Sequence, residues 1–188
     1  MPIKKFAAAL GVCSLVCLAI LGLRTEAAAQ HDEKKGDAGS ITKAVAVLFP
    51  TAKSDVKGRV TFTHDGKAIH VHAEISGLTP GEHGFHVHEF GVWNEDGMAS
   101  GGHFNPTKAP HASHSSDKRH VGDMGNIKAD ESGNATVDLD DDQMSFEGPT
   151  SILGRGLVVH AKADDLKTQP SGDAGGRLAV AIIGVAKP

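Results

Sequence analysis

The sequence predicts an all-β fold, either a sandwich or a barrel, and three observations lead to this class. Short runs of alternating or β-branched residues are bounded by glycine, proline or aspartate, which is the pattern of strands. These runs recur at regular intervals from about residue 42 to residue 186. No convincing long amphipathic helix interrupts them.

The predicted strands follow one another with short turns at first and with two long interruptions later. In chain order they are 42–49, 58–66, 67–78, 84–91, a hairpin over 126–140 with its turn near 132–134, 156–162 and 177–186. The interruptions are 92–125, which is rich in histidine, and 162–176, which is rich in aspartate, glycine and lysine. Loops this long inside a compact domain are usually functional or disordered, so we expect the first to carry a site.

The N-terminal residues predict an exported protein. Lys4 and Lys5 precede the apolar run 6–23, and small residues follow up to Ala29. That order is typical of a secretory signal peptide, so we expect residues 1–29 to be removed and the mature chain to begin at Gln30. An uncleaved membrane anchor is the alternative, because the apolar run is of borderline length. We expect 30–41 to be a flexible segment and 42–188 to be one domain.

Cleavage changes both the charge and the cysteine content. The removed segment holds three basic residues and one acidic residue, so the formal net charge of −4 becomes about −6 in the mature chain. This charge argues against nucleic acid as a partner and makes any anionic substrate dependent on local positive charge. Cys13 and Cys17 are lost, so the mature chain must rely on its core, a metal or a partner instead of a disulfide.

Two pairs of histidines alternate with apolar residues in predicted strands. His70 and His72 lie in "AIHVHAE", and His86 and His88 lie in "GFHVHEFG". Residues i and i+2 of a strand point to the same face, so each pair presents two imidazoles side by side. No ligand-rich segment follows the first pair, and we expect it to form an exposed face open to weak adventitious metal binding.

The second pair is followed by many more metal-ligand residues, which are His103, His111, His114, His120, Asp123 and His160. Three histidines with one aspartate suit a tetrahedral zinc site, and four histidines suit a tetragonal copper site. The residues therefore predict a histidine-rich centre with one or two metals. Spacing alone does not assign each histidine to a metal.

Five motifs in this order resemble the copper–zinc superoxide dismutases. They are "GFHVHEFG", "GGHFNP", "RHVGDMGN", "LVVHAKADD" and "AGGRLAVAIIG", and the resemblance extends over about 42–186. It implies an eight-stranded Greek-key β-barrel, related to the immunoglobulin-like sandwiches, with two long functional loops.

The resemblance also implies a role for each residue of the predicted centre. The copper ligands would be His86, His88, His103 and His160. The zinc ligands would be His103, His111, His120 and Asp123, so that His103 bridges the two metals and also supplies a proton during catalysis. Asp164 would link His86 to His111, and Arg177 would draw superoxide towards copper through its permanent charge. His114 matches no role in the family, and we expect a solvated loop histidine.

The sequence departs from the family at the disulfide that usually ties the first long loop to the last strand. The two positions are Gly97 and Val180 here. We hypothesise that Val92, Trp93 and Met98 hold the loop instead, by packing on the barrel or on a second subunit, although they could simply cover local surface. The short segment 165–177 resembles bacterial periplasmic members more than eukaryotic cytosolic ones.

The predicted function is dismutation of superoxide to oxygen and hydrogen peroxide by a copper- and zinc-dependent enzyme in the periplasm or outside the cell. The alternative is a non-enzymatic metal-binding or copper-delivery protein on the same barrel, because fold does not determine function. Delivery proteins of this family tend to lose ligands and the arginine, whereas every one of these positions is kept here. We expect no stable membrane anchor, and the sequence leaves monomer and homodimer both open.

Overall fold

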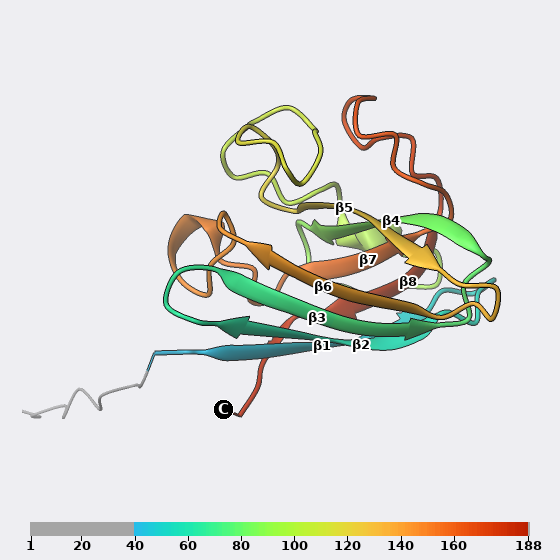
Figure 1. Cartoon of the computed structure of the whole chain (residues 1–188), viewed down its shortest axis with the longest axis horizontal. Coiled ribbons are helices and arrows are strands. Elements are labelled where there is room, and N and C mark those ends of the chain that lie inside the picture. The colour runs from blue at the N-terminus through green and yellow to red at the C-terminus, as the bar shows by residue number, and fades with distance from the viewer. Residues whose placement is uncertain (1–39, 188) are drawn as a thin grey trace, which may run out of the picture. The chain divides into compact units, whose positions relative to one another are not determined.

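The computed structural model describes residues 40–187, and strands dominate them (Figure 1). The strands are Lys43–Pro50 (β1), Lys57–His64 (β2), Ile69–Ser76 (β3), Gly81–His88 (β4), Asp123–Ala129 (β5), Ala135–Asp141 (β6), Gly156–His160 (β7), Arg177–Ile182 (β8) and Gly184–Val185 (β9). Two 3-10 helices, Met98–Ser100 (η1) and Gly148–Thr150 (η2), lie in the loops. The predicted signal peptide and nearly all of the segment 30–41 fall outside the described residues. Within 40–187 no helix is long and apolar enough to span a bilayer.

The strands form one antiparallel sheet that curls into a nearly closed barrel, which confirms the predicted fold class (Figure 1). Their order is β5-β4-β7-β8-β1-β2-β3-β6, and the short β9 pairs with β1 beside β8. The neighbours β4–β7 and β3–β6 are distant in sequence, as in a Greek key.

The predicted hairpin over 126–140 is wrong in one respect. The turn forms, with the Asp130 amide donating to the Asn134 carbonyl, but the strands on either side of it do not pair with each other. β5 pairs with β4, whereas β6 pairs with β3. The turn therefore carries the chain from β5 to β6, the two edge strands between which the barrel is not closed by hydrogen bonds. Local pattern cannot distinguish this crossing from a hairpin because both need the same turn residues.

The core follows the two-residue period of the strands. In β3, Ile69, Val71, Ala73 and Ile75 point inward and are buried, and the residues between them face outward. β4 differs, because every residue from His83 to His88 is buried. Phe85 and Val87 belong to the core, so His86 and His88 lie on the outer face and are covered by the two long loops.

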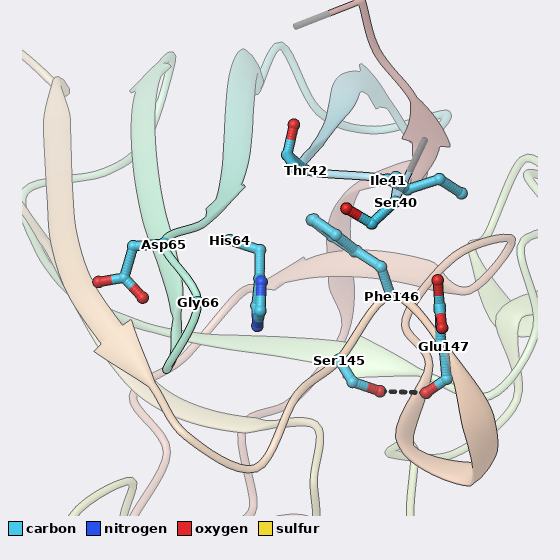
Figure 2. Close-up of a pocket in the computed structure, with 9 residues that line it drawn as sticks. All are labelled: Ser40, Ile41, Thr42, His64, Asp65, Gly66, Ser145, Phe146 and Glu147. Atoms are coloured by element: carbon cyan, nitrogen blue, oxygen red, sulfur yellow. Dashed lines mark hydrogen bonds between the residues drawn. The ribbon is translucent and has the colours of Figure 1, made fainter. Parts of the chain in front are cut away.

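The described chain begins against the loop that joins β6 to η2. Ser40 and Ile41 line a pocket there together with His64 and Phe146, whose rings lie 6.4 Å apart (Figure 2). None of the predicted site residues lines this pocket. The predicted site residues therefore lie elsewhere in the fold.

Candidate metal centre

Strand pairing and two bulges bring the site residues together around β4. His86 lies opposite Asp123 at the start of β5, and the register shifts between Gly84 and His86. On the other side, β7 ends at His160, which lies opposite Arg177 after a second register shift. Bulges of this kind bend a strand and re-aim side chains, and they are over-represented next to active sites.

The first long loop, 92–125, passes back alongside β4 at His103 and Phe104. His103 forms an isolated β-bridge with His88, and the Phe104 amide donates to the Val87 carbonyl over 2.8 Å. The loop then continues to His111 and His120, whose ring centroids lie 5.2 and 5.6 Å from that of His103. A residue fifteen positions after His88 in sequence is thus placed beside it by backbone hydrogen bonds.

Two groups of ligand atoms result, and within each group the atoms lie within 4.8 Å of one another. The first group is His86, His88, His103 and His160. The second group is His103, His111, His120 and Asp123. All seven ligand residues expected from the sequence are brought together, and His103 belongs to both groups.

The hydrogen bonds of His88 and His160 leave two ring nitrogens facing each other. His88 Nδ1 lies 2.9 Å from the Gly101 carbonyl oxygen, and His160 Nδ1 lies 3.3 Å from that of Gly175. A carbonyl only accepts, so each Nδ1 carries the proton and each Nε2 presents a lone pair. The two Nε2 atoms are 3.2 Å apart. Two lone pairs at this distance repel each other, and a cation between them would remove the repulsion.

His86 and His103 complete this group with buried nitrogens that have no hydrogen-bond partner. His86 Nε2 is paired with Asp164 Oδ2 at 2.8 Å, which leaves Nδ1 free. His103 Nδ1 is paired with Asp123 Oδ1 at 2.8 Å, which leaves Nε2 free. Unpaired buried polar atoms are costly and rare in native proteins. A metal ion bound by four imidazole nitrogens accounts for them.

The second group converges on one carboxylate oxygen. Asp123 Oδ1 lies 2.8, 3.0 and 3.2 Å from the Nδ1 atoms of His103, His111 and His120. Asp123 is fully buried, and its other oxygen accepts the backbone amides of Ala112 and His120. Three imidazoles and one carboxylate form a donor set that suits zinc.

Asp164 joins the two groups from outside. Its Oδ1 lies 2.9 Å from His111 Nε2, and its Oδ2 lies 2.8 Å from His86 Nε2. Asn126 on β5 orients this aspartate, because its amide group donates to the Asp164 carbonyl and accepts from the Asp164 amide. A carboxylate in this position sets the tautomer of each ring and raises its basicity.

Gly172 is a supporting residue that sequence reasoning missed. It adopts φ +66°, and a Cβ at this position would overlap Asp164 Oδ1 and lie 2.7 Å from His111 Nε2. Only glycine combines this backbone conformation with the required close approach. The glycine content of the segment 162–176 was the available signal, but it did not single out one position.

The two groups of ligand residues differ in their protonation and charge. Burial lowers the pKa of His103 to about 4 and that of His160 to about 3, so these rings are neutral at pH 7 and can donate lone pairs to a metal. Burial also opposes the charge of Asp123, but hydrogen bonds from three histidines hold its pKa far below the ordinary value. Burial opposes the charge of His111 as well, but hydrogen bonds to Asp123 and Asp164 raise its pKa to about 9. The first group is therefore made of neutral rings, whereas the second group pairs a carboxylate with a histidine that binds its proton tightly until a metal replaces it.

Arg177 holds the first long loop at the positions where the family has its disulfide. A Cβ on Gly97 would lie 3.0 Å from Val180 Cγ2, so these two residues are neighbours. The Arg177 guanidinium donates to the carbonyls of Gly97 and Gly101, and over 2.9 Å to the hydroxyl of Ser100. Ser100 is fully buried, and its hydroxyl donates to the Gly97 carbonyl over 3.0 Å.

The apolar residues expected to hold the loop do not bury themselves on the barrel. Val92, Trp93 and Met98 remain 47%, 44% and 61% exposed. Trp93 makes one polar contact with the barrel, where its indole N–H donates to the Pro50 carbonyl over 3.3 Å. Packing on the chain's own barrel is therefore not how this loop is held.

His114 is not the solvated loop residue that the sequence suggested. Its side chain is 28% exposed, and its Nε2 lies 3.2 Å from Asp141 Oδ2. Asp141 is buried and also accepts the Arg119 guanidinium over 2.8 Å. Arg119 and Asp141 are far apart in sequence, so no local pattern indicated that His114 would lie beside them.

A barrel that carries two adjoining histidine-rich centres with one shared imidazole defines a class of binuclear metalloprotein. The model of the family described as "Copper/zinc superoxide dismutase (SODC)" matches residues 56–183. The chain is 40% identical over 158 residues to a protein of Brugia pahangi named "Extracellular superoxide dismutase [Cu-Zn]", covering 78% of this chain and 79% of that one. It is also similar to the structure titled "Crystal Structure Analysis of the clock protein EA4", with 41% identity, a TM-score of 0.72 and coverage of 79% of this chain and 97% of that one. The chain belongs to the copper/zinc superoxide dismutase family.

Proposed function

We propose that the chain dismutes superoxide at a copper ion held by His86, His88, His103 and His160, next to a zinc ion held by His103, His111, His120 and Asp123. The observation that supports this assignment is the shared ring. His103 Nδ1 faces the carboxylate group of ligands, and its unpartnered Nε2 faces the all-histidine group. Neutral imidazoles suit a copper ion, and a set that includes a carboxylate suits zinc.

When bound, copper supplies the alternating one-electron oxidation and reduction that dismutation requires, and zinc has no redox chemistry. The chain supplies the binding, the charge and the proton path. His103 Nε2 is the atom at which a proton can be taken up and released beside the reacting oxygen. Asp164 keeps the rings of His86 and His111 in place while this happens.

An open pocket gives a small anion access to the centre. Its lining includes His88, Met98, His103, His160, Gly175 and Arg177. Arg177 is the register partner of His160 and carries the permanent positive charge of this pocket. After removal of 1–29 the net charge of the mature chain would be about −6, and against this background the charge of Arg177 is what draws superoxide to the site.

The test measures superoxide decay by pulse radiolysis on a sample whose copper and zinc content is determined in parallel. We expect fast catalytic decay that scales with copper content. A sample fully loaded with both metals that leaves superoxide decay at its uncatalysed rate would reject the enzyme and favour the metal-delivery alternative. The variant His88→Gln should lose copper and activity but retain zinc.

We further propose that the protein forms a homodimer. The exposed large apolar side chains of residues 40–187 come from only three neighbouring regions, namely β1, the β8–β9 end and the segment 90–98: Val47, Phe49, Phe90, Val92, Trp93, Met98, Ile182 and Val185. These regions adjoin, because β1 pairs with β8 and β9, and a Cβ on Gly91 would lie 3.1 Å from Ile182 Cγ2. Large continuous apolar patches usually mark protein interfaces, and an identical copy supplies a matching one.

Sedimentation velocity tests this interface. The wild-type chain should sediment as a dimer and Ile182→Glu as a monomer, because the added carboxylate would be desolvated at the interface. Thr136→Glu, on the exposed outer face of β6, is the matched control and should remain dimeric. A wild-type chain that sediments as a monomer, or an Ile182→Glu variant that stays dimeric, would reject the proposal.

We also propose that the mature protein works outside the cytoplasm. The N-terminal pattern of 1–29 supports export, and the Brugia pahangi relative is named as extracellular. N-terminal sequencing of the exported protein should begin at Gln30. A sequence that begins at Met1 would reject cleavage.

A further inference from the structure

The histidines of the predicted exposed face meet two aspartates across the β3–β6 strand pair. His70 lies directly opposite Asp140, and His72 lies directly opposite Asp138. The structure assigns to this face a candidate third metal site, formed by His70, His72 and Asp138 with Asp140 beside them, for a divalent transition metal such as Zn²⁺.

The geometry places one carboxylate oxygen between two imidazoles. Asp138 Oδ1 lies 3.0 Å from His72 Nδ1 and 3.3 Å from His70 Nε2. The other ring nitrogen of His70 lies 2.8 Å from Asp140 Oδ1. Cross-strand pairing therefore aligns an i, i+2 pair of imidazoles with an i, i+2 pair of carboxylates on one surface.

The type of ligand selects the type of ion. Two imidazole nitrogens and a carboxylate oxygen are a donor set used for Zn²⁺, which leaves a fourth position for water. Ca²⁺ and Mg²⁺ prefer sets made entirely of oxygen, so they are the less suitable ions here. The charge also fits, because two carboxylates balance a divalent cation.

The side chains can move to form a coordination sphere. At present they form a ladder of hydrogen bonds, in which the imidazoles flank Asp138 instead of converging on one point. His70, His72 and Asp138 are 46%, 43% and 59% exposed, so rotation about their side-chain bonds meets little packing. The metal would take the place of the ring protons that now face the carboxylates.

This face is separate from the proposed copper and zinc ligands. None of its residues is a proposed ligand, and the strand pair β3–β6 has no hydrogen-bonded pairing with β4, β5 or β7. The first long loop reaches this face at 114–117, which line a pocket together with Asp140. The outward residues of β2 beside it, Thr61 and Thr63, lie opposite His72 and His70 and carry no charge. Zinc binding at this face can therefore be measured on an enzyme whose catalytic metals are already in place.

The experiment dialyses the copper- and zinc-loaded mature protein against Zn²⁺ and counts bound metal by mass spectrometry, with isothermal titration for the affinity. We expect about one zinc per chain beyond the copper and zinc of the centre. The double variant His70→Gln/His72→Gln should lose this extra zinc, or bind it at least about tenfold more weakly, since one tenfold step is 1.4 kcal/mol. His64→Gln, which removes a histidine at the end of β2, is the matched control and should keep it.

Two outcomes would overturn the inference. One is a loaded wild-type protein that takes up no zinc beyond its two catalytic metals. The other is an extra zinc that persists with the same affinity in the double variant, which would place it elsewhere on the chain. Superoxide decay by the double variant should equal that of the wild type, so a failure of this inference is distinct from a failure of the proposed enzyme function.

Discussion

The buried hydroxyl of Ser100 offers a sharp test of how the first long loop is held without a disulfide. Ser100 donates to the Gly97 carbonyl over 3.0 Å and accepts the Arg177 guanidinium over 2.9 Å. The contact with Arg177 joins positions that are 77 residues apart in sequence. We expect Ser100→Ala to loosen the segment 97–101 and to destabilise the protein.

The magnitude follows from the two hydrogen bonds that are lost. A neutral one contributes about 0.5–1.5 kcal/mol and one to a charged group about 1.5–3 kcal/mol. The Gly97 carbonyl and the Arg177 guanidinium still bind each other, so neither is left without a partner. The expected loss is therefore near the low end of the sum, at about 2 kcal/mol. For a domain of this size, that lowers the melting temperature by about 4–8 °C.

The assay uses metal-free protein, because bound metals violate the two-state assumption behind a free energy of unfolding. Denaturant unfolding gives the stability, and hydrogen exchange reports on the amides of Ser100 and Gly101, which donate within the loop. Ser116→Ala, which removes an exposed hydroxyl from the same loop, is the control and should change stability by less than about 0.5 kcal/mol.

The loaded enzyme provides a second readout. Ser100 is a positioning residue, since it touches Arg177 and not the substrate. We expect kcat/KM of Ser100→Ala to fall by less than about tenfold, which is 1.36 kcal/mol, and its dependence on ionic strength to weaken. A variant with unchanged unfolding, unchanged exchange and unchanged salt dependence would refute the role of this hydroxyl.

Three further predictions concern other parts of the molecule. Gly172→Ala should displace Asp164 and weaken metal binding about 10–100-fold in a chelator competition, and unchanged retention of both metals would contradict the positioning role of Asp164. Arg177→Ala should slow superoxide decay and weaken its dependence on ionic strength while metal content stays normal. Arg177→Lys should keep that dependence, because it keeps the charge. If the rate depends on ionic strength equally in the wild type and in Arg177→Ala, Arg177 does not attract superoxide. The hydrogen bond that His70 donates to Asp140 raises the pKa of His70 above 6.5, so the stabilisation from this pair is complete below pH 6.5 and disappears as the pH rises through the raised pKa. The difference in melting temperature between wild type and His70→Gln should therefore shrink towards alkaline pH, and a difference that stays constant would refute the pairing.

Local pattern was sufficient for much of the fold and for the inventory of ligand residues. Alternation in stretches such as Ile69–Ser76 predicts a half-buried strand, because the side-chain period of two is a local property of the backbone. The same period predicts that His86 and His88 share one face. The family motifs then named seven ligand residues, and the structure brings all seven into two adjoining groups.

Other features depend on contacts between distant residues, and only the folded chain decides them. His70 and His86 have the same local pattern, yet one is exposed and the other is fully buried because the long loops cover β4 and leave β3 open. The lone pair that each imidazole offers depends on the partner of its other nitrogen, such as the Gly101 carbonyl for His88. Three more features depend on distant contacts in the same way. They are the unpaired edges of β5 and β6, the hydrogen bond between Ser100 and Arg177, and the pairing of His114 with Asp141. Each requires the chain to close on itself over tens of residues, and a pattern read over a few neighbours carries no information about that closure.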